Sequence, residues 1–584
     1  MEMVKVTIDG IQTEVPKNST ILAAAKSLGI DIPSLCYLNI GSADYKNDCA
    51  SCRICVVEVE GRRNLAPSCA TPVFDGMNVT TNSMKVMQRR KTVLELMLSD
   101  HPKDCLACSK SGDCTLQDLA IQFGIREIRF EGEESTYRKD YSPSIIRDMD
   151  KCIMCRRCET MCNKIQTVGA LSGVNRGFEA VVAPAFEQDL EDSVCTYCGQ
   201  CVAVCPVGAL NEADHTWEVV RALADDRKKV IVQVAPAVRA ALGEEFGYPV
   251  GTNVEGEMVT ALKKLGFDGV FDTNWAADLT IMEEASELKA RLEKYLAGDE
   301  KALPILTSCC PAWVKFIEHN FPDMLDVPSS AKSPQQMFGA VAKNIWAKEE
   351  GINREDLVVV SVMPCLAKKY EAGREEFSKD GNPDVDISIS TRELAKLLKQ
   401  ANIDLKKLPK SKFDAPLGDY TGAGVIFGRT GGVIEAATRT AYEWVTGETL
   451  ENVDFEALRG YEGCRVATVK VGDLDLRIGI AHGLGEARSL LEKVRAGEEK
   501  LHAIEIMACK GGCVGGGGQP YHNGNFEIIK KRTEALNTID ENCEIRKSHE
   551  NPYVKAIYEK HLEKPMSHKA HELLHTKYFP KHKI

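Results

Sequence analysis

Two copies of one cysteine pattern lie between residues 152 and 206 of this 584-residue chain. Within each copy the cysteines are separated by two, two and three residues, and the second copy ends in Cys205-Pro206. This spacing is typical of proteins with two [4Fe–4S] clusters, in which the fourth cysteine of each run binds the other cluster. It therefore predicts two crossed sets of ligands. The sets are Cys152, Cys155, Cys158 and Cys205, and Cys195, Cys198, Cys201 and Cys162.

Cysteine usage also restricts the class of protein. The chain has 23 cysteines, and 16 of them lie at or before Cys205. Such density in an exported protein would indicate disulfides, but the first residues, MEMVKVTIDG, contain no apolar signal segment. We therefore expect a cytoplasmic iron–sulfur protein. No apolar run approaches the ~20 residues of a membrane helix, and the net charge of −12, with acids and bases interspersed, argues against a nucleic-acid partner.

Residues 1–80 predict a [2Fe–2S] domain. Alternation over residues 4–8, followed by Asp9-Gly10, indicates a β-hairpin, and residues 20–29 indicate a short helix that ends at glycine. The segment resembles the β-grasp ferredoxin domain of the large iron–sulfur subunit of complex I. Cys49 competes as a ligand, but it does not match the CRxCxVEVEG pattern of that domain and is given no role. The spacing suits a [2Fe–2S] cluster on Cys36, Cys52, Cys55 and Cys69.

Residues 81–140 carry one histidine and three cysteines at ligand spacing, namely His101, Cys105, Cys108 and Cys114. Imidazole can replace a thiolate at an iron–sulfur cluster and tends to raise its reduction potential. The same four side chains could also build a zinc site. The block HPKDCLACSKSGDCTLQDLA closely resembles the [4Fe–4S] segment of complex I and of modular hydrogenases. This resemblance favours iron.

From residue 223 onward the cysteines become sparse and the pattern is that of an α/β domain. Helical patterns such as 255–265 and 280–296 separate short apolar runs. Three of these runs lead into cysteines, and another leads into Ala235-Pro236. Because parallel α/β sheets bind ligands at the carboxyl ends of their strands, the sequence predicts one thiolate site built from several strand ends. The predicted strands are 230–234, 303–306, 358–362 and 502–506.

The last predicted strand leads to Cys509 and Cys513, which precede a run of four glycines. Alone they could be two structural cysteines near a turn, but a glycine-rich backbone suits a bulky inorganic group that needs close main-chain approach. Three segments resemble the signature motifs of [FeFe]-hydrogenases, and the resemblance extends over essentially the whole chain. They are TSCCPAW (307–313), MPCLAKKYE (363–371) and EIMACKGGCVGGGGQP (505–520).

The resemblance implies an H-cluster, which is a [4Fe–4S] cubane bridged by a thiolate to a two-iron unit with CO, cyanide and azadithiolate ligands. The implied cubane ligands are Cys310, Cys365, Cys509 and Cys513, with Cys513 as the bridging thiolate. Lys368 would meet a cyanide. Ala237 stands where many family members have serine. The implied lining of the two-iron pocket is Ala235, Pro236, Ala237, Gln335, Met363, Lys368 and Met507.

The resemblance also implies a proton-relay role for Cys309, which precedes a cubane ligand. A thiol titrates near ~8.5, so a modest perturbation lets it exchange protons at cellular pH. The implied route continues through Glu284, Ser329 and Glu287 to Arg291 at the mouth. Without the resemblance, such acids would indicate a solvated helix face. The matching segments IMEEASEL and PSSAKSPQQ favour the proton route.

The sequence thus predicts a multidomain α/β chain with an N-terminal β-grasp domain and a C-terminal, two-lobed α/β H-cluster domain. The expected domains are 1–80 for the [2Fe–2S] cluster, 81–140 for the histidine-ligated [4Fe–4S] cluster, 141–222 for the two ferredoxin-like [4Fe–4S] clusters, and 223–584 for the H-cluster. The expected reaction is reversible H₂ oxidation and proton reduction. No flavin or NAD site is expected in this chain.

The block 1–140 resembles the catalytic subunit of NAD(P)-linked, electron-bifurcating hydrogenases. This implies flavin/NAD(P)-binding and thioredoxin-like [2Fe–2S] subunits similar to the NADH module of complex I, with ferredoxin as a further partner. The alternative is a monomeric, ferredoxin-dependent hydrogenase, because the chain ends soon after the H-cluster domain. A third alternative is an H₂ sensor or electron carrier on the same fold, which the presence of Cys309 and the glutamates disfavours.

Other features have structural interpretations. The segment 421–432, TGAGVIFGRTGG, lacks the GK[ST] of a phosphate-binding loop, so we expect tight packing near the H-cluster. His571 and His575 lie four apart, where a polar C-terminal helix is favoured over a metal site. Cys464 and Cys543 have no partner at ligand spacing and are predicted to be plain thiols.

Overall fold

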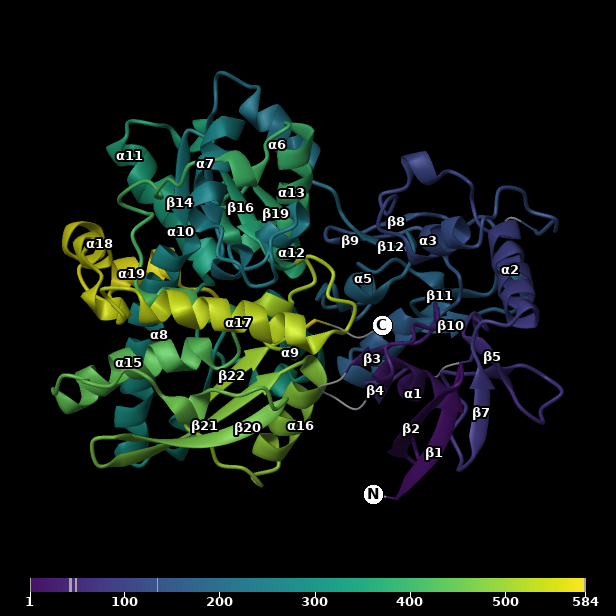
Figure 1. The fold of residues 1–584 in the computed structure, drawn as a ribbon. Coiled ribbons are helices and arrows are strands. Elements are labelled where there is room, and N and C mark those ends of the chain that lie inside the picture. The colour runs from purple at the N-terminus through teal and green to yellow at the C-terminus, as the bar shows by residue number, and fades with distance from the viewer. Residues whose placement is uncertain (1, 41–44, 48–49, 134, 582–584) are drawn as a thin grey trace.

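The computed structural model describes residues 2–40, 45–47, 50–133 and 135–581, so Cys49 lies outside the described residues. A cluster-rich N-terminal part and a C-terminal part with two four-stranded sheets lie side by side (Figure 1). Within the described ranges, no helix is both long and apolar enough to cross a membrane.

A five-stranded sheet of order β2-β1-β7-β5-β6 forms the first domain. β1 and β2 form the predicted hairpin in antiparallel register, with Ile8 opposite Ile11. Asp9 and Gly10 connect them with φ of 50° and 83°, the left-handed conformation that a tight hairpin turn of this kind requires. The predicted helix is present as α1 (Ile21–Ser27). The strands are β1 (Met3–Ile8), β2 (Ile11–Pro16), β5 (Val56–Val59), β6 (Ala66–Pro67) and β7 (Met77–Thr80).

Short elements surround the cysteine loops that follow. α2 (Met84–Ser99) and α3 (Thr115–Gln122) flank the loop with the predicted histidine-ligated site. The ferredoxin-like part has a small antiparallel sheet of order β12-β9-β8 and two short helices, each of which contains one cysteine of a run. Its elements are β8 (Asp140–Tyr141), β9 (Ile145–Arg147), α4 (Arg157–Thr160), β10 (Ser172–Val174), β11 (Val181–Ala183), α5 (Gln200–Val204) and β12 (Leu210–Glu212).

The C-terminal part contains two four-stranded sheets. The first has the order β14-β13-β16-β19 and is parallel throughout. The second has the order β15-β22-β21-β20, in which only the edge pair β20–β21 is antiparallel. All four predicted strands are present. The strands are β13 (Lys229–Val234), β14 (Gly269–Asp272), β15 (Ile305–Leu306), β16 (Leu357–Met363), β19 (Ile387–Ser390), β20 (Cys464–Val471), β21 (Leu474–His482) and β22 (Ala503–Met507).

The first sheet is buried on both faces. Val230, Val232 and Val234 of β13 pack into one apolar cluster, and Ile231 packs into another on the opposite face. This explains why its sequence is a continuous apolar run rather than an alternating one. β15 is shorter than predicted, because Pro304 has no N–H to donate to a neighbouring strand.

Helices connect and cover the two sheets. The predicted helix 255–265 is present as α7 (Glu255–Leu265). α8 (Thr273–Leu296) begins seven residues earlier than predicted, with Asp272 as its N-cap. Figure 1 shows α17 (Phe526–Glu541) running between the lobe of β13 and β16 and the lobe of β21 and β22. Other helices of this part are α6 (Thr216–Leu223), α9 (Pro311–Asn320), α10 (Pro334–Val341), α12 (Ala367–Ala372), α13 (Thr391–Gln400), α15 (Gly432–Thr446), α16 (Leu484–Arg495), α18 (Pro552–Ile557) and α19 (His568–Leu574).

Candidate active site and cluster sites

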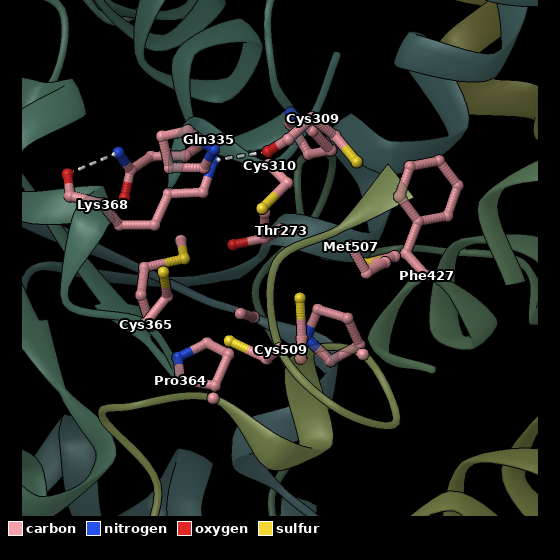
Figure 2. A pocket seen from close by; sticks show the side chains of 18 of the residues that line it. Thr273, Cys309, Cys310, Gln335, Pro364, Cys365, Lys368, Phe427, Met507 and Cys509 are labelled. Carbon is pink, nitrogen blue, oxygen red and sulfur yellow. Dashed lines mark hydrogen bonds between the residues drawn. The ribbon is translucent and has the colours of Figure 1, made fainter. Parts of the chain in front are cut away.

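The carboxyl ends of strands from both sheets open into one internal cavity (Figure 2). Cys310 lies at the N-terminus of α9, just after β15, and Cys365 follows β16. Cys509 follows β22, and Cys513 begins the 3-10 turn Cys513–Gly515. All four thiols and Cys309 line the cavity. The structure therefore brings the predicted cubane ligands together from both lobes.

The cavity suits a cationic inorganic group. Burial raises the pKa of all four thiols, that of Cys365 to about 12, and the charges of neighbouring thiols add to the effect at Cys365, Cys509 and Cys513. Four thiolates in so small a buried space need compensating positive charge, which an iron–sulfur cluster supplies. The chemistry of the donor set thus fits the predicted cubane.

The glycine run brings the backbone of one lobe against the other. A Cβ atom on Gly516 would lie 2.0 Å from the carbonyl oxygen of Pro364, and one on Gly512 would lie 2.7 Å from the backbone N of Thr430. Gly512 also has a φ of 93°. Any side chain at these positions would push the Cys513 turn away from the neighbouring loops.

A buried carboxylate that was not predicted from the sequence holds two of the predicted pocket residues. Glu371 Oε2 accepts hydrogen bonds from Lys368 Nζ at 2.8 Å, from Gln335 Nε2 at 2.9 Å and from Ser333 Oγ at 2.9 Å. Lys368 Nζ also donates to the carbonyl oxygen of Cys309 at 3.1 Å (Figure 2). Burial alone would lower the pKa of Lys368, but the Glu371 charge raises it, so the ammonium stays charged.

The remaining predicted pocket residues divide into two groups. Ala235, Pro236, Gln335, Met363, Lys368 and Met507 line the cavity. Ala237 is not among the lining residues, and its carbonyl oxygen accepts a hydrogen bond of 2.9 Å from Gln519 Nε2. Further residues line the cavity that were not predicted as site residues, among them Thr273, Ala277 and Phe427. Phe427 belongs to the segment 421–432, whose residues are all buried, as tight packing requires.

The inner part of the predicted proton route lies beside the cavity. Cys309 lines the cavity, and burial, followed by the charge of Glu284, raises its pKa well above the ordinary thiol value. Burial and then the charge of Glu287 raise the pKa of Glu284 to about 8. Ser308 was not predicted as a site residue. Its Oγ lies 3.5 Å from Glu284 Oε1 and donates to the carbonyl oxygen of Ala331.

The outer part of the route is continuous. Ser329 Oγ donates to Glu287 Oε2 at 2.8 Å, and Arg291 donates to Glu287 Oε1 at 2.6 Å. Arg291 also donates to the carbonyl oxygen of Val327 at 3.0 Å, and its side chain is 19% exposed. Glu284, Glu287 and Arg291 all lie on α8, at the predicted spacings.

The two crossed ferredoxin-like sets are also assembled. Cys152, Cys155, Cys158 and Cys205 line one small cavity. In the second set, burial and the charges of Cys198, Cys195 and Cys162 raise the pKa of Cys201. The fourth cysteine of each run therefore lies with the first three of the other, as the spacing predicts.

The two outer sites both approach the first ferredoxin-like set. The Asn47 side-chain amide donates to the carbonyl oxygens of Cys36 and Cys155 at 2.7 and 2.9 Å, which links the predicted [2Fe–2S] site to that set. A Cβ atom on Gly208, three residues after Cys205, would lie 2.6 Å from Cys108 Sγ. Both predicted sites therefore lie against the same set of four cysteines.

The two ring nitrogens of His101 have the environments expected of a metal ligand. Its Nδ1 lies 2.9 Å from the carbonyl oxygen of Pro102, while its buried Nε2 has no hydrogen-bond partner among the described residues. Metal-binding histidines commonly hydrogen-bond a carbonyl through one ring nitrogen and bind the metal through the other. Burial, and then the charges of Cys108 and Cys105, raise the pKa of Cys114, so the three thiols lie near one another.

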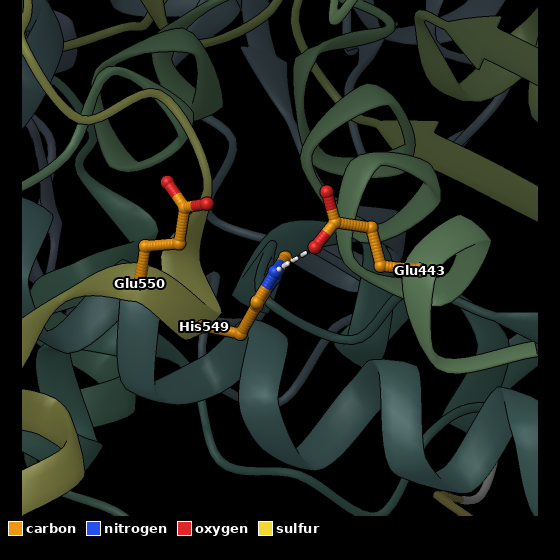
Figure 3. Close-up of side chains that lie close together, drawn as sticks. All are labelled: Glu443, His549 and Glu550. Atoms are coloured by element: carbon orange, nitrogen blue, oxygen red, sulfur yellow. Dashed lines mark hydrogen bonds and ion pairs between the residues drawn. The ribbon is translucent and has the colours of Figure 1, made fainter. Parts of the chain in front are cut away.

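Two histidine-containing clusters elsewhere have structural roles. Glu443, His549 and Glu550 lie close together (Figure 3), but Lys547 Nζ lies 2.7 Å from Glu443 Oε1 and 2.9 Å from Glu550 Oε1. The ammonium pairs with both carboxylates, so the group is an ion-pair cluster. His571 stacks on His575, which lies just after α19.

His575 is held by two other elements and does not share a ligand site with His571. Its Nε2 lies 3.0 Å from Glu283 Oε2, and its Nδ1 lies 2.8 Å from Ser330 Oγ. The C-terminal segment is thereby joined to α8 at Glu283. Cys464 and Cys543 are partly buried, and both form no disulfide in the described part of the chain.

Family models match five segments of the chain. Residues 228–517 match the C-terminal domain of the iron-only hydrogenase large subunit, and 526–581 match the iron hydrogenase small subunit. Residues 1–84 match a 2Fe–2S iron–sulfur cluster binding domain. Residues 90–129 match an iron–sulfur binding region of NADH–ubiquinone oxidoreductase G, and 142–211 match the ferredoxin-like domain of NADH–quinone oxidoreductase subunit 3.

Individual relatives agree with these matches. The chain is 67% identical to the NADP-reducing hydrogenase subunit HndD of Solidesulfovibrio fructosivorans, over 100% of both chains. It is 39% identical to iron hydrogenase 1 of Clostridium pasteurianum, over 99% of this chain and 100% of that one. A solved [FeFe]-hydrogenase structure, HydA(deltaEFG), covers 63% of this chain and 99% of its own with 42% identity and a TM-score of 0.57.

The fold, the thiol-lined cavity and these matches define an iron–sulfur oxidoreductase with several cluster domains. The chain belongs to the [FeFe]-hydrogenase family and is a catalytic subunit of that family. The predicted family is therefore confirmed, together with domains for 2Fe–2S, 4Fe–4S and H-cluster binding.

Proposed function

We propose that this chain catalyses the reversible interconversion of H₂ with protons and electrons at an H-cluster held by Cys310, Cys365, Cys509 and Cys513. The observation that carries the proposal is that these thiols reach one buried cavity from the strand ends of two lobes. When bound, the H-cluster supplies the iron site at which H₂ is cleaved or formed. The protein holds the cluster, excludes bulk water and moves protons.

Lys368 places a positive charge at a fixed position in the cavity wall. Its ammonium is fixed between the carbonyl oxygen of Cys309 and the Glu371 carboxylate, and it lines the cavity. A fixed cation in a buried site favours anionic ligands more strongly than it would in water. This supports the assignment of Lys368 as the partner of a cyanide ligand.

Protons leave and reach the cavity through Cys309, Glu284, Ser329 and Glu287, with Arg291 at the outer end. The contact of Ser329 with Glu287 and the nearness of Cys309 to Glu284 support the two ends of this route. Glu284, with a pKa of about 8, holds a proton at neutral pH and can still release it. The Glu284–Ser329 step requires a side-chain movement or a water molecule.

Three accessory [4Fe–4S] clusters and one [2Fe–2S] cluster, held by the N-terminal cysteines and His101, would supply electron transfer to the active site. The ligand sets that we propose are those predicted from the spacing, and the domain boundaries that we propose are 80, 140 and 222. Separate family matches to residues 1–84, 90–129, 142–211 and 228–517 support a division into four domains. The contacts of Asn47 and Gly208 support a branched path, in which both outer clusters meet the first ferredoxin-like cluster.

The physiological role that we propose is the hydrogenase subunit of a cytoplasmic, electron-bifurcating complex that couples H₂ to NAD(P) and ferredoxin. The 67% identity to a subunit named as NADP-reducing supports a nucleotide-linked role. The sequence carries no flavin or dinucleotide fingerprint, so partner subunits would supply the flavin and nucleotide sites.

A monomeric, ferredoxin-dependent hydrogenase is the second candidate. It is favoured by the match to iron hydrogenase 1 of Clostridium pasteurianum, which covers the same modules from end to end. The identity of 39% to this protein is lower than the 67% to the NADP-reducing subunit, and we therefore rank it second.

One experiment separates the two candidates. The chain is purified with its native neighbours, its infrared CO and cyanide bands are recorded, and H₂ oxidation is assayed with NAD(P)⁺ alone, with ferredoxin alone and with both. Bifurcation requires both acceptors together. Full-rate oxidation with ferredoxin alone would exclude it, and absence of the CO and cyanide bands would exclude the H-cluster.

A further inference from the structure

A glutamine of the ferredoxin-like part reaches into the H-cluster domain. Gln200 lies between Cys198 and Cys201 in the second cysteine run, and its side chain is buried. Its Nε2 lies 3.2 Å from Cys509 Sγ and 3.0 Å from the carbonyl oxygen of Gly515. A primary amide carries two N–H groups, so these two contacts use both donors.

The contact lies in a closely packed interface between the ferredoxin-like part and the H-cluster domain. A Cβ atom on Gly517 would lie 2.7 Å from the carbonyl oxygen of Cys198 and 2.7 Å from the Cα of Gly199. Gly199 has a φ of 72°, which glycine adopts without strain. The two backbones therefore touch beside Gln200, and neither position accepts a side chain. This packing fixes the distance between the Gln200 amide and the sulfur.

A second glutamine, Gln166, hydrogen-bonds the backbone at the end of β22 but contacts no sulfur. Gln166 Nε2 donates to the carbonyl oxygen of Ala508 at 2.8 Å, and its Oε1 accepts from the backbone N of Leu484 at 2.8 Å. Gln166 follows the first cysteine run as Gln200 lies within the second. The interface thus contains one amide that contacts the ligand sulfur and one that contacts only the adjacent backbone.

Hydrogen bonds to cluster sulfurs are one of the factors that set iron–sulfur reduction potentials. Reduction adds negative charge to the cluster and its thiolates, so an N–H donor stabilises the reduced form more than the oxidised form. The amide stays neutral and keeps its donors at every physiological pH. Its effect on the potential is therefore constant, unlike that of a titrating side chain.

We propose that Gln200 is a positioning residue that raises the reduction potential of the cubane by donating a hydrogen bond to Cys509, and so favours electron transfer from the ferredoxin-like part to the active site. The inference rests on the proposed role of Cys509 as a cubane ligand. It assigns the ferredoxin-like part a second task besides carrying electrons, namely setting the potential of the next cluster.

The test compares Gln200→Met with Gln166→Met in the full chain carrying its clusters. Both variants replace an amide by an apolar side chain of similar length at the same interface, but only the first loses a donor to sulfur. The midpoint potential of the cubane is measured by redox titration followed through its infrared and electron paramagnetic resonance signals. We expect Gln200→Met to lower the reduced-to-oxidised ratio at a fixed potential about tenfold, which is about 59 mV for a one-electron couple.

In Gln166→Met the midpoint potential of the cubane should change from the wild-type value by less than a third of the shift expected for Gln200→Met. An unchanged potential in Gln200→Met, or an equal shift in both variants, would overturn the proposal, because the second result would indicate general loosening of the interface. Gln200→Leu provides an independent check, because it also removes both N–H donors and adds no charge, so the potential should fall by a similar amount. Failure of the proposed function is seen separately, as loss of the cubane signal from the wild-type chain.

Discussion

Ser329 Oγ donates a hydrogen bond of 2.8 Å to Glu287 Oε2, and this contact joins the segment between α9 and α10 to helix α8. If protons cross this contact, Ser329→Ala should lower turnover by about 10²-fold, the lower end of what a positioned proton donor contributes. The infrared bands of the H-cluster should not change, because Ser329 does not line the cavity. The measurement is H₂ evolution with a chemical reductant.

Ser330→Ala is the matched control. Ser330 contacts the same Glu287 oxygen through its backbone N at 3.2 Å, which the substitution retains, while its hydroxyl contacts His575. Its turnover should stay within about twofold of the wild type, since surface and backbone-retaining changes have small effects. Equal losses in both variants would point to loop distortion rather than proton transfer.

Glu371→Gln should disturb the pocket through Lys368. The Lys368–Glu371 contact of 2.8 Å is almost fully buried, and without the carboxylate charge burial would lower the pKa of Lys368. We expect a loss of about 3 kcal/mol in stability, typical of breaking a buried pair, and a shift of the cyanide bands in the infrared spectrum. Glu375→Gln, four residues along on an exposed position, is the control and should change neither. Unshifted cyanide bands in a folded Glu371→Gln protein would show that Lys368 does not contact the cyanide ligand.

Much of the site could be predicted because its signals are local in sequence. Cluster ligands within one loop need fixed spacings, so the two cysteine runs specify their crossed sets directly. The strands that end at Cys365 and Cys509 are short apolar runs followed by Pro364 or by glycines, and both patterns are visible without a structure. The start of α8 could not be found in this way, because residues 273–285 are buried on every side and show no helical period.

The residues that were missed act across long sequence separations. Gln200 and Gln166 contact Cys509 and Ala508 from more than 300 positions away, and amide side chains give no periodic or spacing signal. Glu371 could have been found, since it lies three residues after Lys368, the spacing at which opposite charges pair on a helix. The family resemblance implies Ala237 as a pocket residue, but Ala237 does not line the cavity and its carbonyl oxygen accepts from Gln519 Nε2.

His101→Ala tests whether the site of residues 101–114 holds iron. Its Nε2 is buried without a partner among the described residues, so we expect it to be a ligand whose loss empties the site. Metal analysis should show about four fewer iron atoms per chain, as for one [4Fe–4S] cluster, with unchanged infrared bands from the distant H-cluster. His568→Ala, at an exposed position of α19, should retain all iron. Loss of one zinc atom with unchanged iron would establish the alternative metal.

His522 should make the H-cluster domain less stable as the pH falls. It lies two residues after the glycine-rich motif, is 7% exposed, and faces Arg532 and Arg392. Burial, and then these two cations, lower its pKa to about 4, whereas an unfolded histidine titrates near ~6.5. The unfolded chain therefore binds an extra proton between these values, so stability is complete above pH ~6.5 and is lost as the pH falls toward 4.

The cost at pH 5 relative to pH 7 is about 2 kcal/mol for this one group. His522→Asn removes the titration and can keep the acceptor that His522 Nδ1 offers to the backbone N of Gly524 at 3.2 Å. Scanning calorimetry between pH 7 and 5 should therefore give a smaller decrease in Tm for His522→Asn than for the wild type. Comparing the two proteins removes the contributions of acid-sensitive clusters and of buried His482, which both proteins share. Parallel Tm curves would mean that His522 is not held neutral by its burial and by the two arginines.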